Sequence, residues 1–184
     1  MKILFFSDSH GSAKAMGELS LAIHNFQPEL IVMLGDALYH GPRNALPGNY
    51  DTKKTADILN LYKNKIMAVR GNCDAEVDQM MLQFPIMNDY STLYAGQTRF
   101  FLTHGHIWNK SNPPPIPKGT ILAHGHTHIP TLDTTGDIII FNPGSIAIPK
   151  NGNPPTYGTW DNGILAVRNL ADGSVYNGLS WSVQ

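Results

Sequence analysis

Side chains that could bind metal ions follow five short apolar runs in the sequence. They are two carboxylates, four imidazoles and one amide, namely Asp8, His10, Asp36, Asn72, His104, His126 and His128. Oxygen and nitrogen donors of these kinds suit Mn²⁺, Fe, Zn²⁺ or Ni²⁺, and they suit Ca²⁺ or an iron–sulfur cluster poorly. The donors are numerous enough for two metal ions, and two ions can hold both the attacking oxygen and the phosphoryl oxygens during hydrolysis of a phosphate ester.

Two pairs of these donors stand two residues apart, as Asp8-x-His10 and His126-x-His128. A strand end presents residues at this spacing on the same side. Two divalent cations would outweigh the charge of the two aspartates, so the site would be positive. A positive site attracts a phosphate ester and lowers the pKa of a bound water molecule. The residue types therefore indicate metal-assisted hydrolysis of a phosphate ester.

The apolar runs before the donors are predicted to be strands that position them. Their ranges are Ile3–Phe6, Leu30–Leu34, Ile66–Val69, Phe100–Leu102 and Ile121–Ala123. Apolar residues at helical spacing predict one helix that Ser12 could cap and a second that Asp51 or Thr52 could cap. Strands that alternate with helices predict a parallel sheet with right-handed crossovers. Ligands of such sheets bind beyond the carboxyl ends of the strands, so the seven donors are expected to converge on one crevice.

The second half of the chain is predicted to consist mainly of short strands. Further strands are expected at Ile138–Phe141, in a hairpin of Tyr157–Trp160 with Ile164–Val167, and at the edge over Ser174–Val183. Residues 109–118 are expected to be loop, because three successive prolines exclude helix and central strand there. The whole chain, residues 1–184, is interpreted as one domain with two packed sheets and helices outside, an α/β sandwich.

The composition excludes several classes of protein. Hydrophobic residues make up 42% and charged residues 15%, which is unlike a disordered chain. Thirteen basic and fourteen acidic residues leave a net charge of −1, which argues against a dedicated nucleic-acid or anionic-membrane binder. The single cysteine excludes an internal disulfide and fits a reducing compartment. The apolar start of the chain is too short for a signal peptide or a membrane span, so a cytoplasmic location is expected.

Five motifs together resemble the calcineurin-like metallophosphoesterase superfamily, and the resemblance covers the whole chain. In order they are Asp8-Ser9-His10, Gly35-Asp36, Gly71-Asn72-Cys73-Asp74, Thr103-His104-Gly105-His106 and Gly125-His126-Thr127-His128. The resemblance implies a four-layer αββα sandwich, in which two mixed β-sheets are flanked by helices. It also implies two divalent cations, with Mn²⁺ as the first expectation and Zn²⁺, Ni²⁺ or Fe²⁺ as alternatives.

The same resemblance implies a role for each donor. The first metal ion would be bound by Asp8, His10 and His128. The second would be bound by Asn72, His104 and His126, and Asp36 would bridge the two. A bridging hydroxide would attack phosphorus directly, without a covalent phosphoenzyme. The implied activity is that of a phosphodiesterase, a hydrolase that converts a small phosphodiester into a phosphomonoester and an alcohol, with Asp36, Asn72, Cys73 and His104 as catalytic residues.

Cys73 departs from the family pattern, since many members have a histidine there that assists the leaving group. A thiol is a poor hydrogen-bond donor, and nearby cations would push it toward thiolate, which donates nothing. Activated diesters are therefore expected to react better than alkyl monoesters. The next residue, Asp74, could either orient a neighbouring imidazole or cap a helix that starts near Ala75.

Two further residues are candidates for contact with substrate. Arg43 lies in the loop after Asp36 and could pair with a phosphate oxygen, although a surface arginine is an equal alternative. His106 matches no ligand position, and a packing role is weighed above contact with substrate. The segment from Asn142 to Ser145 is either a tight turn or a support for the site.

Two other functions are compatible with the same residues. One is a phosphomonoesterase, and the other is a non-catalytic scaffold that binds proteins, since the fold also occurs in the retromer scaffold subunit with a degraded metal site. Competent residues at all seven ligand positions argue against the scaffold. A homo-oligomer is compatible with the exposed edge strands that the pattern predicts.

Overall fold

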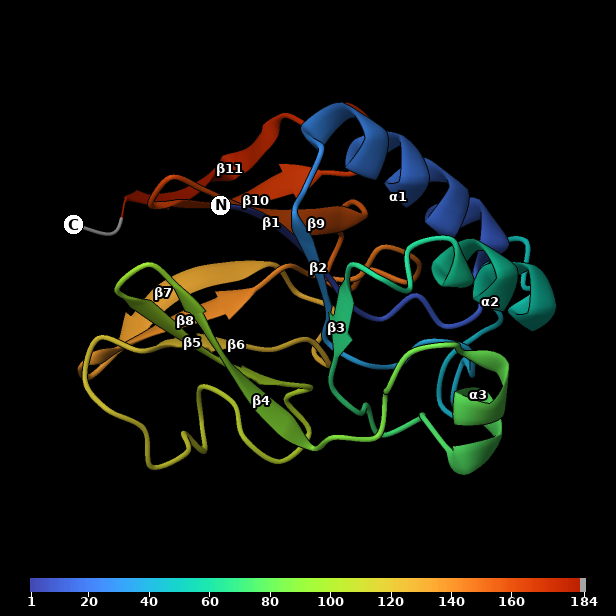
Figure 1. Ribbon diagram of the computed structural model, residues 1–184, viewed down its shortest axis with the longest axis horizontal. Helices are drawn as coiled ribbons and strands as arrows, with labels where there is room; N and C mark the ends of the chain where they lie inside the picture. Colours follow the sequence, from blue (N-terminus) through green and yellow to red (C-terminus); the bar gives the residue numbers. More distant parts are fainter. Residues whose placement is uncertain (183–184) are drawn as a thin grey trace.

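Two β-sheets lie face to face in the structure, a computed structural model that describes residues 1–182 (Figure 1). The first sheet has six strands in the order β11 (Val175–Ser182), β10 (Ile164–Asn169), β9 (Thr156–Asp161), β1 (Lys2–Phe6), β2 (Leu30–Met33) and β3 (Ile66–Ala68). The second has five in the order β4 (Tyr90–Ala95), β5 (Thr98–Thr103), β6 (Ile121–Ala123), β8 (Ile138–Asn142) and β7 (Thr131–Thr135). The expected sandwich of two mixed sheets is confirmed.

Each sheet contains a block of three parallel strands. In the first sheet β1 pairs with β2, and β2 with β3. In the second sheet β5 pairs with β6, and β6 with β8. The remaining pairs are antiparallel, including the β9–β10 hairpin that the Asn162-Gly163 turn predicts. Val183, the last residue of the predicted edge strand, lies outside the described residues.

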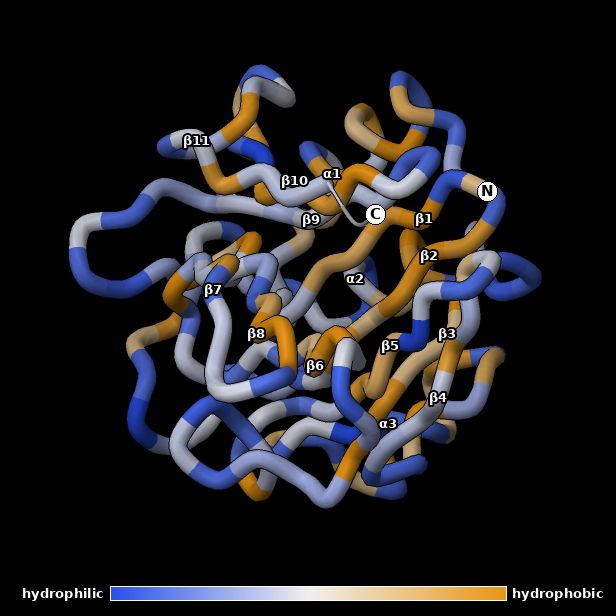
Figure 2. The backbone as a smooth tube through the Cα atoms, turned by 90° about the vertical axis from the view of Figure 1, so that its left-hand side faces the viewer, coloured by the Kyte–Doolittle hydropathy of each residue, from blue (hydrophilic) through white to orange (hydrophobic). Residues whose placement is uncertain are grey.

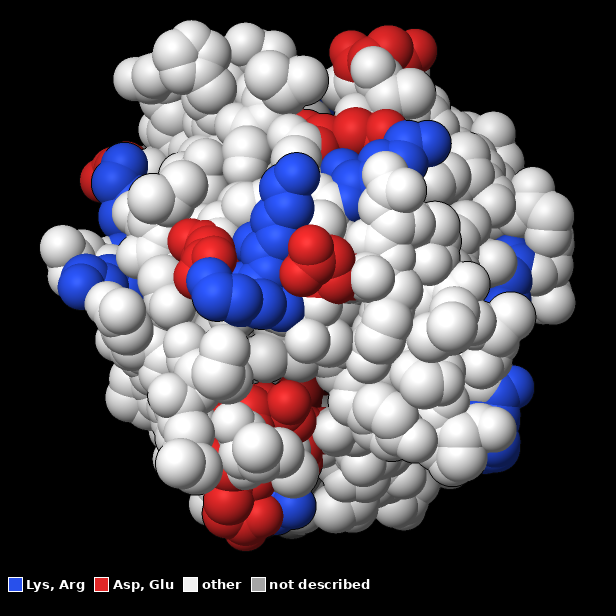
Figure 3. All heavy atoms as spheres, turned by 90° about the vertical axis from the view of Figure 1, so that its right-hand side faces the viewer, with Lys and Arg blue, Asp and Glu red and all other residues white. Residues whose placement is uncertain are grey.

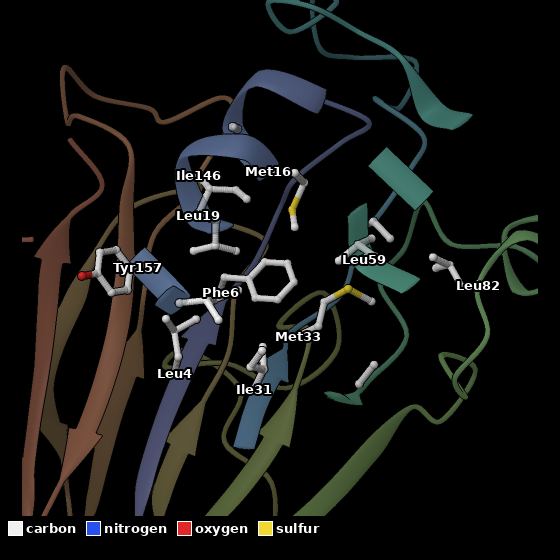
Figure 4. Close-up of a cluster of buried hydrophobic side chains, with 14 of the residues drawn as sticks. Leu4, Phe6, Met16, Leu19, Ile31, Met33, Leu59, Leu82, Ile146 and Tyr157 are labelled. Atoms are coloured by element: carbon white, nitrogen blue, oxygen red, sulfur yellow. The ribbon is translucent and has the colours of Figure 1, made fainter. Parts of the chain in front are cut away.

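The side chains of β1 alternate between two hydrophobic cores. Ile3 and Phe5 point between the sheets, where the ring of Phe5 lies 5.5 Å from that of Phe100 and 5.2 Å from that of Phe141. Leu4 and Phe6 point the other way, into a core that the first sheet forms with its helices (Figure 4). Because both faces are covered, β2 and residues Ile3–Phe6 of β1 are apolar throughout, and Figure 2 shows both strands as largely hydrophobic stretches.

Helices α1 (Ala13–Phe26) and α2 (Thr52–Asn60) cover the outer face of the first sheet. The hydroxyl of Ser12 accepts a hydrogen bond from the backbone N–H of Ala15, and the carboxylate of Asp51 accepts one from Lys54, so both predicted caps are confirmed. On the side of the molecule that carries these helices, Lys and Arg stand beside Asp and Glu in small groups separated by uncharged surface (Figure 3). None of the helices described in residues 1–182 has both the length and the apolar character that a membrane span requires.

The outer face of the second sheet is covered by a loop. Phe101, Leu122, Ile138 and Ile140 form a third cluster there, against which Trp108 and Ile116 of the connection between β5 and β6 pack. The fourth layer of the sandwich is therefore irregular, because the prolines at 113–115 prevent a helix in this connection. The short helix α3 (Glu76–Met81) follows β3 on the side of α2.

Candidate metal centre

The seven donor side chains lie directly after five of the six parallel strands. Parallel strands end at the same edge of a sheet, and both blocks open toward one crevice. The donors come from the residues after β1, β2, β3, β5 and β6, namely Asp8, His10, Asp36, Asn72, His104, His126 and His128. The structure brings all seven together, as described below, although they span more than a hundred residues of sequence.

The carboxylate of Asp36 occupies the middle of the group. Its Oδ2 lies 3.6 Å from Nε2 of His10 and 3.4 Å from Nε2 of His104. These two imidazoles belong to different sheets, since His10 follows β1 and His104 follows β5. The carboxylate of Asp36 therefore approaches an imidazole of each half of the centre.

The half on the β1 side contains Asp8, His10 and His128, all buried. Oδ1 of Asp8 lies 3.6 Å from Nε2 of His10 and 3.3 Å from Nε2 of His128, and these two nitrogens lie 3.3 Å apart. Three donor atoms from these residues fit within 4.8 Å of one another. This spacing suits ligands arranged around a single cation.

The half on the β5 side contains Asn72, His104 and His126. Nε2 of His104 lies 3.1 Å from Oδ1 of Asn72 and 3.3 Å from Nδ1 of His126. His104 is buried, whereas Asn72 is exposed and His126 is partly exposed. This half therefore opens to solvent.

Backbone carbonyls fix the orientation of three of the imidazoles. Nδ1 of His10 lies 2.7 Å from the carbonyl of Tyr39, Nδ1 of His104 lies 2.7 Å from that of Leu34, and Nδ1 of His128 lies 2.6 Å from that of Ile148. A carbonyl only accepts, so each Nδ1 is the donor and carries a proton. In a neutral ring, each Nε2 then carries a lone pair that points into the centre, as metal ligation requires.

A buried carboxylate oxygen of the centre has no hydrogen-bond partner, and this observation supports metal binding. Oδ1 of Asp8 is buried, and no hydrogen-bond donor contacts it within residues 1–182. Its nearest neighbours are the Nε2 atoms of His10 and His128, which are also acceptors in neutral rings. A buried polar atom without a partner is costly, and a cation between these atoms would satisfy all of them. The residues therefore fit a divalent metal ion.

Electrostatic interactions in the centre favour positive charge. Burial by itself would raise the pKa of Asp8, but the side chains of His10 and His128 hold it well below its usual value. Burial would lower the pKa of His104, but the side chain of Asp36 and the charge of Asp8 raise it to about 9. Burial, followed by the charge of His104, lowers the pKa of His126 to about 4, so this imidazole stays neutral and its nitrogen can bind a metal ion. The charged carboxylate of Asp8 attracts cations to the same site.

Five of the seven donors have a left-handed backbone conformation. The φ angles are 57° at Asp8, 45° at His10, 57° at Asp36, 66° at His126 and 60° at His128. Residues with a Cβ rarely adopt this conformation, and such strain collects at functional sites where the surroundings enforce it. These five residues all lie in the loops that follow β1, β2 and β6.

Asp74 braces two of the loops that carry donors. Its carboxylate accepts hydrogen bonds from the backbone N–H groups of Asp36, Ala37 and Gly71, at 2.9, 2.8 and 2.7 Å. Both sequence-based alternatives for Asp74 are therefore wrong. It contacts no imidazole among the hydrogen bonds of residues 1–182, and the start of α3 is capped instead by Asp78, whose carboxylate accepts from the N–H of Ala75.

Two motif glycines allow the donor loops to approach closely. A Cβ at Gly71 would collide with the carboxylate of Asp36, and a Cβ at Gly125 would collide with the hydroxyl of Ser7.

The segment after β8 supports the same loops. Ser145 donates a hydrogen bond to the carbonyl of Asp8 at 2.8 Å, and Nδ2 of Asn142 donates to the carbonyl of Gly125 at 2.8 Å.

A cavity of about 360 Å³ lies over the donors. Its walls include Asp36, Arg43, Asn72, Cys73, His128 and Lys150. Arg43 thus lies at the centre, and Lys150 is a second cation there that the sequence patterns did not single out. His106 is exposed and stands beside the open half, with its ring 5.5 Å from that of His104 and 6.2 Å from that of His126. It is not among the residues that line this cavity.

Cys73 is half-buried at the edge of the cavity. Its Sγ lies 3.2 Å from Nδ2 of Asn72, and its backbone N–H donates to Oδ1 of Asp36 at 2.8 Å. Burial, followed by the negative charge of Asp36, raises the pKa of the Cys73 thiol to about 12. The protein's own groups therefore favour the thiol, which is a weak hydrogen-bond donor.

Comparisons with known proteins agree on one protein family. A family model for the calcineurin-like phosphoesterase superfamily domain matches residues 1–162. The phosphodiesterase YfcE of Escherichia coli is 46% identical over 175 residues, which cover 95% of each chain. The probable metallophosphoesterase MG207 of Mycoplasma genitalium is 28% identical over 171 residues, which cover 87% of this chain and 86% of the relative.

Solved structures show the same fold. The E. coli phosphoesterase YfcE matches with a TM-score of 0.96 and 43% identity over 100% of both chains. A zinc complex of Vps29 from Entamoeba histolytica matches with a TM-score of 0.61 and 21% identity over 96% of both chains, a likeness of fold alone.

Proposed function

Because the chain belongs to the calcineurin-like phosphoesterase superfamily, we propose that it is a phosphodiesterase that binds two divalent cations. The substrate class is a small phosphodiester. Water adds to phosphorus, the bond to one alcohol oxygen breaks, and the products are a phosphomonoester and an alcohol.

The observation that carries this proposal is the position of Asp36 between two groups of donors. We assign Asp8, His10 and His128 to the first cation, and Asn72, His104 and His126 to the second. Asp36, whose carboxylate approaches an imidazole of each group, would contact both. When bound, two such cations supply an activated water and neutralise the charge on phosphoryl oxygens.

The other side chains of the cavity would bind and orient the substrate. Arg43 and Lys150 line it from two separate loops and would attract the anionic phosphate. Cys73 stands next to Asn72, where it contributes little acid catalysis, since its thiol is a weak donor. This arrangement favours diesters whose alcohol leaves readily without a proton. From the resemblance to the calcineurin-like superfamily we infer that water attacks phosphorus directly and that no phosphoenzyme forms.

Mn²⁺ is the cation that we expect first, and Zn²⁺, Ni²⁺ and Fe²⁺ suit the same donors. Four imidazoles and an amide argue against Ca²⁺, which takes oxygen ligands. We also propose a cytoplasmic location, which the free thiol of Cys73 supports, because unpaired thiols persist in reducing compartments.

A substrate and metal panel tests the proposed function. Protein treated with a chelator would be supplied with Mn²⁺, Zn²⁺, Ni²⁺ or Mg²⁺ and assayed on bis(4-nitrophenyl) phosphate and 4-nitrophenyl phosphate, which share one leaving group. We expect Mn²⁺ to restore hydrolysis, with kcat/KM higher on the diester. A higher value on the monoester would indicate a phosphomonoesterase, and protein that binds Mn²⁺ without any hydrolysis would favour a scaffold.

A further inference from the structure

A second cavity adjoins the proposed active site on the side of α3. It has a volume of about 370 Å³ and lies between α3 and the loop that connects β2 to α2. Cys73 lines both this cavity and the one over the donors. The two cavities are therefore neighbours at Cys73, and we call the second one the α3 pocket.

The walls of the α3 pocket are largely apolar and aromatic. Tyr39 and Tyr50 come from the connecting loop, and Val77 and Met81 come from α3. All four present exposed or partly exposed surface rather than a closed core. The volume lies within the range of about 300–1,000 Å³ that is typical of small-molecule sites, which are mostly lined by apolar and aromatic groups.

The aromatic wall is tied to the proposed metal ligands. The carbonyl of Tyr39 accepts the hydrogen bond from Nδ1 of His10, so the backbone of Tyr39 is held by a donor of the centre. The ring of His40 lies 4.8 Å from that of Tyr39 and 5.3 Å from that of Tyr50, in edge-to-face contact with both. The stack and the hydrogen bond of Tyr39 link the pocket wall to a donor of the centre.

The two cavities differ in charge. Arg43 and Lys150 line the cavity over the donors. The α3 pocket has no Lys or Arg among its lining residues in the described part of the chain, and its one acidic group, Asp78, is buried and accepts the N–H of Ala75. An anionic ester group would therefore be disfavoured on this side, and a neutral apolar group would be favoured.

We propose that the substrate is an asymmetric phosphodiester with one apolar, aryl-sized ester group bound in the α3 pocket. The second ester group lies on the side of Arg43 and Lys150 and carries polar or anionic groups. This inference rests on the proposed function and narrows its substrate class. It makes Tyr39, Tyr50, Val77 and Met81 determinants of specificity rather than catalytic residues.

Binding of two inert diester analogues tests the α3 pocket. Benzyl(methyl)phosphinate and ethyl(methyl)phosphinate carry a CH₂ in place of the bridging ester oxygen, so they cannot be hydrolysed. They differ only in the phenyl or methyl group on this CH₂, and we call them the phenyl and the methyl analogue, so the ratio of their Kd values isolates the contribution of the ring. Isothermal titration calorimetry with the Mn²⁺-loaded protein should give at least about tenfold tighter binding of the phenyl analogue, because the ring removes apolar surface from water.

Two neighbouring methionines on α3 provide a matched pair of variants. Met81 lines the pocket and is 43% exposed, whereas Met80 is 85% exposed and does not line it. Met81→Glu should raise the Kd of the phenyl analogue at least about fivefold and leave that of the methyl analogue unchanged. Met80→Glu should change neither value. Val77→Glu, at a position that is 64% exposed, should act like Met81→Glu and provides a second test if the first variant folds poorly.

The outcomes separate this inference from the proposed function. Equal affinity for the two analogues, or equal effects of Met80→Glu and Met81→Glu, would overturn the α3 pocket as a substrate subsite. Hydrolysis of bis(4-nitrophenyl) phosphate would still support the phosphodiesterase in that case. A clear phenyl preference together with a lack of hydrolysis would instead overturn the proposed function and retain the pocket.

Discussion

The two halves of the proposed metal centre differ in their access to solvent. In the β1 half, Asp8, His10 and His128 are buried, and a backbone carbonyl holds Nδ1 of each imidazole. In the β5 half, His104 is held in the same way, but Asn72 is exposed and Nδ1 of His126 faces another imidazole. Fixed, buried donors favour tight binding, and exposed donors favour exchange. We therefore expect a firmly held first cation and a second that exchanges more readily.

Replacing Asp36 should weaken the binding of both cations, because each half of the centre would lose a ligand. Loss of a residue that only supports a metal ligand costs up to about 100-fold. We expect Asp36→Asn, which changes a ligand itself, to reduce kcat/KM on bis(4-nitrophenyl) phosphate by more than this. Metal content after dialysis, measured by plasma emission, should fall as well. Asp57→Asn is the control, since Asp57 pairs with Lys53 on the exposed face of α2. Activity of Asp36→Asn close to that of the control would contradict its bridging role.

Removing one donor from each half tests the comparison directly. We expect His10→Ala to lose the firmly held cation and activity together, even in excess Mn²⁺. Asn72→Ala should retain about one cation per chain after dialysis and should regain part of its activity as Mn²⁺ is raised, because an exposed donor can be replaced by water. Metal stoichiometry and Mn²⁺ titrations of activity give both values. If both variants lose the same amount of metal and respond alike to Mn²⁺, the halves do not differ as proposed.

Replacing Asp74 should weaken metal binding in both halves less than replacing Asp36, because Asp74 acts through the loops that it braces. In Asp74→Asn the amide NH₂ would face backbone N–H groups that now donate to a carboxylate oxygen. We expect the free energy of unfolding to fall by about 2–3 kcal/mol and metal affinity to fall by about 10–100-fold. Urea unfolding and metal titration measure these changes.

Asp78→Asn is the matched control for Asp74→Asn, because Asp78 accepts a single backbone N–H, that of Ala75. It should cost about 1 kcal/mol of unfolding free energy and leave metal affinity unchanged. Equal effects of the two substitutions would show that Asp74 is an ordinary buried carboxylate without a bracing role at the centre.

The sequence was sufficient to predict the central strands and the donors that follow them. Strands such as β1 and β2 are covered on both faces, so their continuous apolar character identifies them, and their parallel order brings Asp8 and Asp36 to one edge. Two strands were missed for the opposite reason. β4 and β7 lie at the edges of the second sheet and expose many side chains, so their composition resembles that of loops.

The parts of the site that were missed depend on backbone geometry. The bonds of Asp74 go to N–H groups, which every residue except proline has, so residue types cannot reveal them. Lys150 reaches the cavity only because the loop after β8 turns back past His128, whose carbonyl accepts the N–H of Lys150 at 3.2 Å. The left-handed conformation of Asp8, His10 and Asp36 is likewise imposed by tertiary contacts, since local preference opposes it.

The smallest expected effect concerns Cys73, at the open half of the centre. A histidine there could donate a proton to a departing alcohol, which the thiol does poorly. We expect Cys73→His to raise kcat/KM roughly tenfold on diesters with alkyl leaving groups, below the 10²–10⁴ of a well-placed general acid. Esters of 4-nitrophenol should show no gain, because this alcohol leaves without protonation. Cys73→Ala removes the thiol without supplying any donor, so it should give no gain on either class. A histidine variant that improves both classes equally, or neither, would show that proton donation at this position does not limit the reaction and that Cys73 acts only as a wall of the two cavities.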